Sequence, residues 1–195
     1  MSEHDINRRV FDENTYGYEM KEDTGLNVCT LASDSSALII NVNGYCHNKG
    51  LPDAKAASGV FWLEMSDQNS GVPVPSKYPQ TLRSAKLYAI ETVLEKFVEG
   101  LDNPEFTAGL PRAFSRIVLV VDSPYVVSCV CAWVWEWERW GWRDGEGKRV
   151  VDWETLEKIH GHFINLQSRG VEVNLWDVPK ERNGEAEEVA KKGLL

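Results

Sequence analysis

The sequence predicts an α/β protein in which a five-stranded mixed sheet is flanked by helices. Strand-like and helix-like segments alternate along the chain, in the order three strands, helix, strand, two helices, strand, helix. Residues 117–121 form a continuous apolar run rich in β-branched side chains, which is typical of a buried central strand. The length of 195 residues, with 43% hydrophobic and 26% charged residues, suits one globular domain and excludes collagen-like or wholly disordered chains.

The first half of the chain contains three predicted strands and one helix. Residues 37–42 are predicted as a strand that ends in a turn at Asn43-Gly44, and residues 59–63 as a second strand paired with it. The loop at residues 66–79 has room for a short third strand. Residues 82–97 are predicted as a helix, because apolar residues recur there at intervals of three and four.

The second half contains the central strand and the remaining helices. After residues 117–121, Ser123 as an N-cap and Pro124 in the first turn start a helix that runs to about residue 139. Asp152 is expected to cap the next helix, which ends near Gly170. Apolar and polar side chains alternate in residues 171–178, which are predicted as the last strand, and Asn183 is expected to begin a final short helix.

The charge is unevenly distributed along the chain. The net charge is −9, and residues 1–36 hold eight acidic and three basic residues. We therefore expect an acidic N-terminal extension at residues 1–36 and a folded domain at residues 37–195. The extension is either a solvated tail or a strand that covers the domain. No basic stripe stands out, so contact with nucleic acid is expected to be local or weak.

The sequence also bears on location and on metal binding. The longest uncharged apolar stretch, residues 123–135, is shorter than the roughly 18 residues of a membrane span, and the N-terminus lacks the apolar core of a secretory signal. We expect an intracellular protein without membrane contact. The pairs Cys129/Cys131 and His160/His162 are predicted on helices, where residues two apart point in different directions, so no zinc site is expected.

Six blocks of sequence form a recognisable series. They are NGYCHNKG (43–50), AKAASGV (54–60), RSAKLYA (83–89), VDSPYV (121–126), the tryptophan-rich stretch that ends in GW (133–142), and VPKERN followed by AEEVA (178–190). Together, and in this order, they resemble the motifs of the ribonuclease H domains. The resemblance covers about residues 37–193 and implies the ribonuclease H-like fold.

The resemblance also implies a chemistry. Members of the family cleave the RNA strand of RNA–DNA hybrids with two divalent metal ions held by four acidic residues. The corresponding positions here are Asn43, Lys86, Asp122 and Glu187, of which only the last two are acidic. The formal charge of the four side chains is therefore about −1, where the family has −4.

An ammonium group at the second of these positions argues against metal binding. Lys86 would repel a divalent ion, and it can form an ion pair with Asp122 or Glu187 instead. We therefore expect a catalytically inactive pseudoenzyme without a cofactor. The alternative is an active ribonuclease H with an altered site, in which Asp122 and Glu187 bind Mg²⁺ or Mn²⁺. A shifted register would offer Glu91 as a further acid, more than one helical turn from the family position.

Two kinds of partner remain open, nucleic acid and protein. The resemblance places Gly44 and Asn48 at the contact with the nucleic-acid backbone, although asparagine in a glycine-rich turn also serves its backbone conformation. In the predicted helix, Trp133 and Trp137 are expected to face the sheet, which leaves Trp135 and Trp140 as an exposed surface for a protein partner. The oligomeric state is not predicted.

Overall fold

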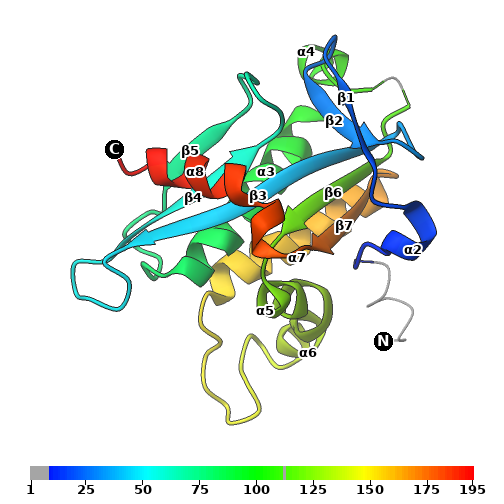
Figure 1. Ribbon diagram of the computed structural model, residues 1–195. Coiled ribbons are helices and arrows are strands. Elements are labelled where there is room, and N and C mark those ends of the chain that lie inside the picture. The colour runs from blue at the N-terminus through cyan, green and yellow to red at the C-terminus, as the bar shows by residue number, and fades with distance from the viewer. Residues whose placement is uncertain (1–8, 112) are drawn as a thin grey trace.

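The computed structural model describes residues 9–111 and 113–195. Within these residues, one sheet of seven strands runs through the molecule (Figure 1). The strands are β1 (Met20–Asp23), β2 (Val28–Leu31), β3 (Ala37–His47), β4 (Lys55–Phe61), β5 (Ser70–Pro73), β6 (Arg116–Val121) and β7 (Glu172–Asp177). β1 to β5 pair antiparallel in chain order, while β6 pairs parallel with β3 and with β7. The predicted mixed sheet is confirmed.

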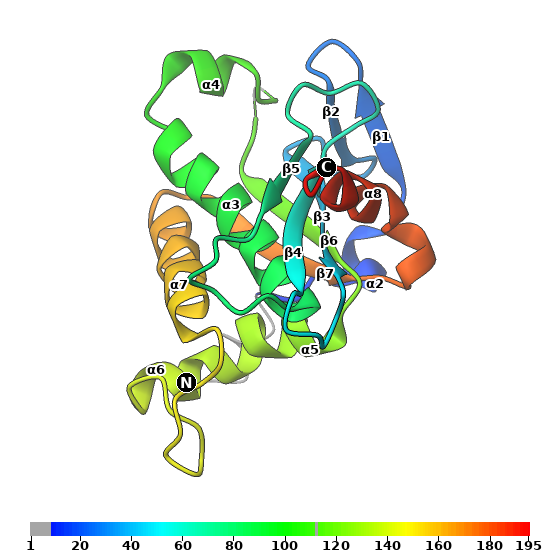
Figure 2. The same cartoon turned by 90° about the vertical axis from the view of Figure 1, so that its left-hand side faces the viewer.

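Helices cover both faces of this sheet. They are α2 (Glu13–Tyr16), α3 (Leu82–Gly100), α4 (Pro104–Ala108), α5 (Pro124–Val127), α6 (Val134–Arg139), α7 (Trp153–Ser168) and α8 (Gly184–Lys192). α3 and α7 lie on one face and α8 on the other (Figure 2). In β3, Leu38 and Ile40 join the larger core under α3 and α7, while Ile39 joins a smaller core on the opposite face. β3 is therefore apolar on both sides, as a central strand should be.

The sheet is larger than predicted, because the segment before residue 37 contributes two of its seven strands. β2 pairs with β3, with Cys29 opposite Ile39. Further towards the N-terminus, Phe11 is buried against Trp176, and Val10 forms a parallel bridge with Leu175 at the edge of β7. Within residues 9–36 the chain thus contributes paired strands and buried side chains to the sheet, as in the covering-strand alternative, although many of its other side chains are exposed. The acidic composition of this segment concealed the few apolar residues that make these contacts. Residues 1–8 of the predicted extension lie outside the described residues.

The predicted turn at Asn43-Gly44 was wrong. β3 continues through both residues to His47, and Asn43 and Gly44 pair with residues of β4. Gly44 is needed here for space: a Cβ at this position would lie 2.6 Å from the Cβ of Ala85 on α3. The glycine marks a close approach of strand and helix, which a single sequence does not distinguish from a turn.

The helix that follows β6 begins as predicted but changes its hydrogen bonding. Ser123 caps it by accepting from the Val126 N–H, and Pro124 occupies the first turn. Between α5 and α6, residues Ser128–Trp133 form a π-helical segment, η1. A π turn holds one more residue than an α turn, so the side chains after it are rotated around the helix. Two carbonyls of this region, those of Val130 and Cys131, accept side-chain hydrogen bonds from Arg9 and Trp135.

α7 and α8 begin where the sequence predicts, but their first residues have other roles. Asp152 has a left-handed backbone (φ 64°), and its carboxylate makes no capping bond. It binds Arg83 Nε at 2.8 Å and Ser84 Oγ at 2.6 Å, both on α3. Asn183 precedes α8. Its side-chain amide is fully buried and donates a hydrogen bond to the carbonyl of Val42 on β3. Both side chains therefore join elements that are distant in sequence.

α8 lies directly on the backbone of two strands. A Cβ on Gly59 of β4 would collide with the carbonyl of Ala186, and a Cβ on Gly71 of β5 with that of Val189. Glycine at both positions lets the helix approach the sheet without intervening side chains. No helix within the described residues combines the length and apolar character that a bilayer crossing requires.

Candidate functional site

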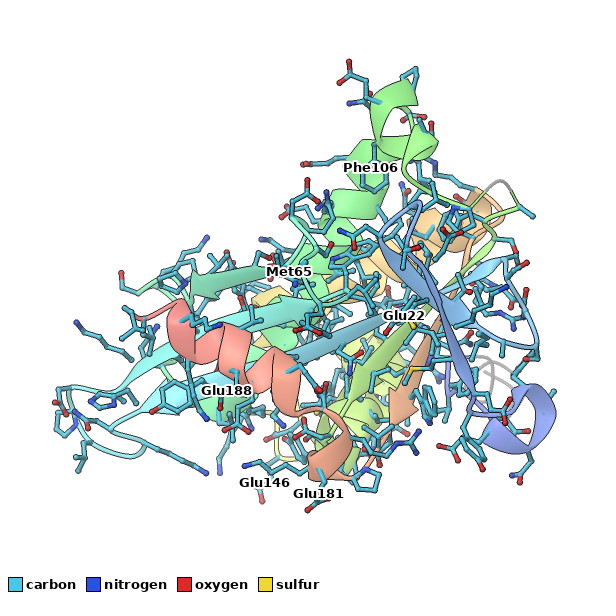
Figure 3. The ribbon with its side chains drawn as sticks, turned by 45° about the horizontal axis from the view of Figure 1, so that its top comes forward. Glu22, Met65, Phe106, Glu146, Glu181 and Glu188 are labelled. Carbon is cyan, nitrogen blue, oxygen red and sulfur yellow. The ribbon has the colours of Figure 1, made fainter. Side chains whose placement is uncertain are left out.

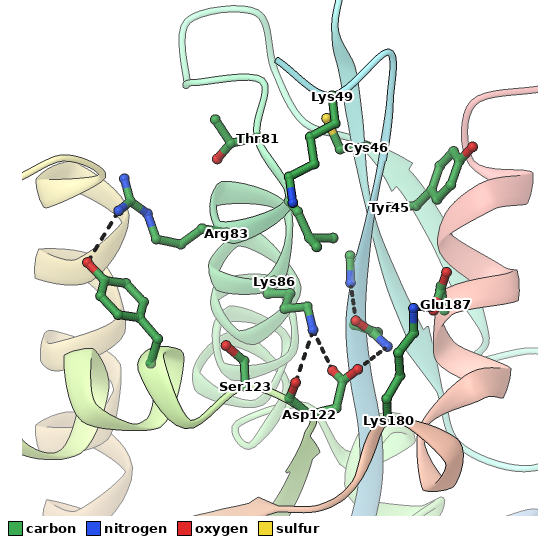
Figure 4. A pocket seen from close by; sticks show the side chains of 14 residues that line it. Tyr45, Cys46, Lys49, Thr81, Arg83, Lys86, Asp122, Ser123, Lys180 and Glu187 are labelled. Carbon is green, nitrogen blue, oxygen red and sulfur yellow. Dashed lines mark hydrogen bonds and ion pairs between the residues drawn. The ribbon is translucent and has the colours of Figure 1, made fainter.

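A cleft of about 770 Å³ opens between the N-terminal end of α3, the C-terminal end of β6, the middle of β3 and α8 (Figure 4). Its lining consists of Asn43, Gly44, Tyr45, Cys46, Lys49, Thr81, Leu82, Arg83, Lys86, Asp122, Ser123, Tyr125, Lys180 and Glu187. The four positions that the resemblance matches to the acids of the family are all in this set. The structure thus brings together Asn43, Lys86, Asp122 and Glu187 from four separate elements.

An ion pair occupies the floor of the cleft. Asp122 follows the last residue of β6, and its Oδ1 lies 2.6 Å from the Nζ of Lys86 on α3. The two side chains are only 3% and 11% exposed, so water screens this pair much less than a surface pair. The ion pair expected between Lys86 and one of the two acids is therefore present, and Asp122 is its partner.

Two asparagine amides donate to the same carboxylate. Asn183 Nδ2 lies 3.3 Å from Asp122 Oδ1, and Asn43 Nδ2 lies 3.4 Å from Oδ2. The Oδ1 of Asn43 accepts from the backbone N–H of Gly44 at 2.8 Å, which holds the amide nitrogen towards Asp122. Asn43 thus presents a donor to Asp122 and keeps its only potential metal ligand, Oδ1, on a backbone amide.

Glu187 lies across the cleft on α8. Its side chain is 21% exposed, and its two oxygens lie 3.3 Å from Lys180 Nζ and 3.5 Å from Lys191 Nζ. Both acids at the family positions therefore have lysine partners. Figure 4 shows Lys180 between Glu187 and the Asp122 pair.

This donor set does not fit two divalent ions. Magnesium binds carboxylate, carbonyl and water oxygens, and an ammonium group offers none. Within the described part of the chain, no three His, Cys, Asp or Glu side chains are close enough together to hold a metal ion. The ammonium of Lys86 occupies Oδ1 of Asp122, one of the two oxygens that this carboxylate could offer a metal.

Glu91, the acid that a shifted register would offer, is outside the cleft. It is buried on the side of α3 that faces α7, and its Oε1 lies 2.5 Å from Lys158 Nζ. The hydrogen bond and charge of Glu91 raise the pKa of Lys158. Glu91 therefore does not line this cleft, whereas Lys86 does.

Three cations and two polar groups of this region are not among the residues that the sequence predicts for the site. Lys49, Arg83 and Lys180 line the cleft, and Asn183 contributes the amide described above. Asp177 ends β7 opposite Val121 of β6. Burial and then the nearby Asp122 raise the pKa of Asp177 above its usual value. Asp177 was detectable in principle, because neighbouring parallel strands end at the same edge of a sheet.

Arg83 connects the cleft to α5 and α7. Besides its bond to Asp152, Nη1 of Arg83 lies 3.3 Å from the hydroxyl of Tyr125. Burial would lower the pKa of Arg83, but the Asp152 carboxylate and the Tyr125 hydroxyl together raise it above its usual value. Arg83 is thus a fixed cation at the rim of the cleft.

Of the two residues expected to contact nucleic acid, Gly44 and Asn48, only Gly44 belongs to the lining of the cleft. Asn48 is in the turn between β3 and β4, where it has a left-handed backbone (φ 50°) and donates to Asp53 Oδ2 at 2.7 Å. Its position therefore agrees with the conformational explanation for an asparagine there.

The predicted exposed tryptophan surface was partly wrong. Trp135 is half-buried, stacked edge-on against His160 with ring centroids 4.6 Å apart, and Arg9 lies over its ring at 4.4 Å. Trp133, which was expected to face the sheet, is 39% exposed, and Trp140 is 53% exposed as predicted. Trp133 is thus exposed and Trp135 half-buried, the reverse of the prediction. The π-helical segment explains this reversal, because its extra residue rotates side chains around the helix relative to an α-helix.

Comparisons with known proteins agree with the fold. No family model matches the sequence. The chain is 24% identical to ribonuclease H1 of Rattus norvegicus over 161 residues and 23% identical to ribonuclease H1 of Mus musculus over 169 residues. These alignments cover 80% and 84% of the chain and 50% and 52% of the two relatives. The chain thus spans about half the length of the curated relatives it matches.

Solved structures show the same likeness. A foamy viral protease–reverse transcriptase in complex with an RNA/DNA hybrid matches with a TM-score of 0.59 at 15% identity, over 80% of this chain and 19% of that one. The solution structure of the PFV RNase H domain matches with a TM-score of 0.54 at 16% identity, over 80% of this chain and 92% of that one. The predicted fold is therefore confirmed.

Proposed function

Because this chain belongs to the ribonuclease H-like family, we propose that it binds nucleic acid, an RNA–DNA hybrid or RNA, in the cleft without cleaving it. The observation that carries the proposal is the contact of 2.6 Å between Lys86 Nζ and Asp122 Oδ1. It supports the proposal because a positive charge tethered to α3 lies against Asp122, one of the positions that the resemblance assigns to the metal ligands.

The size of this effect supports an inactive site. Two unit charges about 4 Å apart interact by roughly 4 kcal/mol at an effective dielectric constant near 20, and a divalent ion doubles this. A metal beside Asp122 would have to overcome this repulsion from Lys86 with fewer carboxylate ligands than the family provides. Displacing Lys86 would also leave an ammonium that is now 11% exposed without its partner.

The same cleft suits phosphate groups. Its lining contains four cations, Lys49, Arg83, Lys86 and Lys180, and two acids, Asp122 and Glu187. Lys86 is neutralised by Asp122, and Arg83 and Lys180 have carboxylate partners in Asp152 and Glu187. The attraction therefore comes from Lys49 and from the ammonium of Lys180, whose side chain is 70% exposed. A few phosphate contacts of this kind give local, salt-dependent binding, as the overall acidic charge of the chain led us to expect.

The test is binding and cleavage of a labelled RNA–DNA hybrid. We expect the hybrid to bind equally well in EDTA and in Mg²⁺, to stay intact in both, and to dissociate as salt rises. Replacing Lys49 or Lys180 with glutamate should weaken binding several-fold and reduce the salt slope by about one. Lys21→Glu, at an exposed lysine on β1 outside the cleft, is the matched control and should bind as the wild type does.

Two results would contradict the proposal. Cleavage that requires Mg²⁺ or Mn²⁺ and disappears in Asp122→Asn would establish the active-enzyme alternative. Equal loss of binding in the Lys49, Lys180 and Lys21 variants would show that the hybrid is attracted by overall charge and does not occupy the cleft.

A further inference from the structure

A second, larger cleft lies on the other side of α8. It has a volume of about 1190 Å³ and runs between α8, the β1–β2 hairpin and the loop that follows β4. Its floor is the part of the sheet that α8 leaves uncovered, where Cys29, Asn41 and Phe61 lie on three adjacent strands. Figure 3 shows Met65, Glu22 and Glu188 on three sides of this part of the sheet. Sites for small molecules have volumes of about 300–1,000 Å³, so this cleft is large enough for a peptide segment.

The cleft exposes apolar side chains to water. Met65 is 90% exposed and Met20 is 51% exposed, and both belong to the lining. Met65 also has a left-handed backbone (φ 66°), an unfavourable conformation for this residue type. Methionine is flexible and polarisable, and it is used at surfaces that adapt to apolar partners. An exposed apolar patch with a polar rim marks an interaction site.

The rim of the cleft is strongly acidic. Six glutamates belong to the lining, namely Glu22, Glu64, Glu181, Glu185, Glu187 and Glu188. The basic residues of the lining are Arg182 and Lys192. Among the described residues, no cation lies within ion-pair distance of Glu22, Glu64, Glu181 or Glu185. Their charges are therefore available to a partner.

We infer that this cleft, the acidic methionine groove, binds a basic amphipathic segment of a protein partner. Unpaired carboxylates repel the phosphates of nucleic acid and the surface of an anionic membrane, so both are disfavoured. Lysine or arginine side chains complement the rim, and apolar side chains between them bury the thioethers of Met20 and Met65. The inference is independent of the proposed function, because the two clefts have opposite charge.

The experiment uses the full chain and a synthetic probe. The probe is a labelled peptide of leucine and lysine, about 18 residues long and amphipathic as a five-turn helix. Binding is followed by fluorescence anisotropy and by the ¹³C-methyl NMR signals of Met20 and Met65, which are assigned with Met20→Leu and Met65→Leu. We expect both methyl signals to shift on peptide addition and to stay unchanged on addition of an RNA–DNA hybrid.

Charge-reversal variants locate the site. Glu22→Lys with Glu185→Lys should weaken peptide binding by about tenfold or more. Glu105→Lys with Glu157→Lys has the same change in net charge at exposed positions outside the groove and should weaken it by less than about twofold. Equal weakening in the two double variants would overturn the inference. So would unchanged methionine signals in the complex, competition by the hybrid, or equal binding of a peptide with serine in place of leucine.

Discussion

Lys86 limits what the first cleft can hold, because its ammonium lies against Asp122 at a position that the resemblance assigns to a carboxylate ligand. Its ammonium satisfies Asp122 within the protein, so the carboxylate needs no ion for its stability. Asn43 reinforces this arrangement, since it gives Asp122 an N–H donor in place of a second negative charge. Asn43 and Lys86 both lower the negative charge around Asp122. Replacing both with acidic residues therefore tests whether these positions correspond to acids of the family.

The double variant Asn43→Asp, Lys86→Glu should bind Mg²⁺. It places four carboxylates around one cleft, where their mutual repulsion destabilises the fold until a cation binds. Its melting temperature should therefore rise with Mg²⁺, by an amount equivalent to about 2.7 kcal/mol when the ion is at about 100 times its dissociation constant. The wild type should show no such rise. The measurement is a thermal melt in EDTA and in increasing Mg²⁺.

The matched control for this prediction is Lys77→Glu, at an exposed lysine that does not line the cleft. It adds a carboxylate elsewhere and should respond to Mg²⁺ as the wild type does. If the double variant is no more sensitive to Mg²⁺ than Lys77→Glu, the correspondence between these residues and the acids of the family is wrong.

At this scale the motifs predicted the positions of side chains but not their orientation. Asn43, Lys86, Asp122 and Glu187 were placed together from sequence blocks alone, because each block has a fixed location on a known fold. The direction of the Asn43 amide depends on the backbone N–H of Gly44, and the choice of Asp122 over Glu187 depends on how α3 packs on β6. A single sequence does not contain these distances.

At the scale of single elements, α8 depends on the glycines beneath it. Gly59→Ala should destabilise the protein by about 3 kcal/mol or more, because the new methyl group meets a backbone carbonyl of α8 that has no room to move. The measurement is urea unfolding followed by circular dichroism. The matched control is Gly161→Ala, on the exposed side of α7, where a Cβ meets nothing within 4 Å.

The control, Gly161→Ala, should stabilise the protein, whereas Gly59→Ala should destabilise it. Alanine in an exposed helix is more stable than glycine by roughly 0.5–1 kcal/mol, so Gly161→Ala should raise the urea midpoint. If Gly59→Ala is as stable as the wild type, α8 does not lie on the backbone of β4 as described.

Elements that depend on local chemistry were the easiest to predict. Ser123 and Pro124 start their helix in the predicted way, because a cap is formed by neighbours in the sequence. The roles of Asn43-Gly44 and Asp152 were predicted wrongly, because both depend on contacts with α3. Gly44 lies against Ala85 of α3, and the carboxylate of Asp152 accepts a hydrogen bond from Ser84 of α3. The π-helical segment likewise depends on a contact distant in sequence, because Arg9, 121 residues away from Val130, donates a hydrogen bond to the Val130 carbonyl.

At the scale of the whole molecule, the N-terminal segment is part of the folded unit. Phe11→Ala should cost roughly 3 kcal/mol of unfolding free energy, because Phe11 is 6% exposed and packs on Trp176 at a centroid distance of 5.0 Å. Tyr18→Ala, on the same segment but 61% exposed, should change it by less than about 0.5 kcal/mol. Urea unfolding measures both. Equal stability of the two variants would mean that the segment is not docked in solution.

The two clefts give the molecule opposite charges on the two sides of α8. Glu187 belongs to the lining of both, so the helix is a shared wall between a cleft with excess cations and a groove with excess carboxylates. The net charge of −9 describes neither side. This explains why composition alone predicted only weak contact with nucleic acid and gave no sign of the groove.

Translation order adds a further constraint on residues 9–16. Glu13 accepts a hydrogen bond from Trp176, which follows it by 163 residues. A ribosome that adds about 5–20 residues per second needs roughly ten to thirty seconds to reach that tryptophan. During this interval Phe11 lacks Trp176, one of the aromatic side chains on which it packs. The contacts that Phe11 and Glu13 make with Trp176 therefore join the first described residues to one of the last strands to be synthesised.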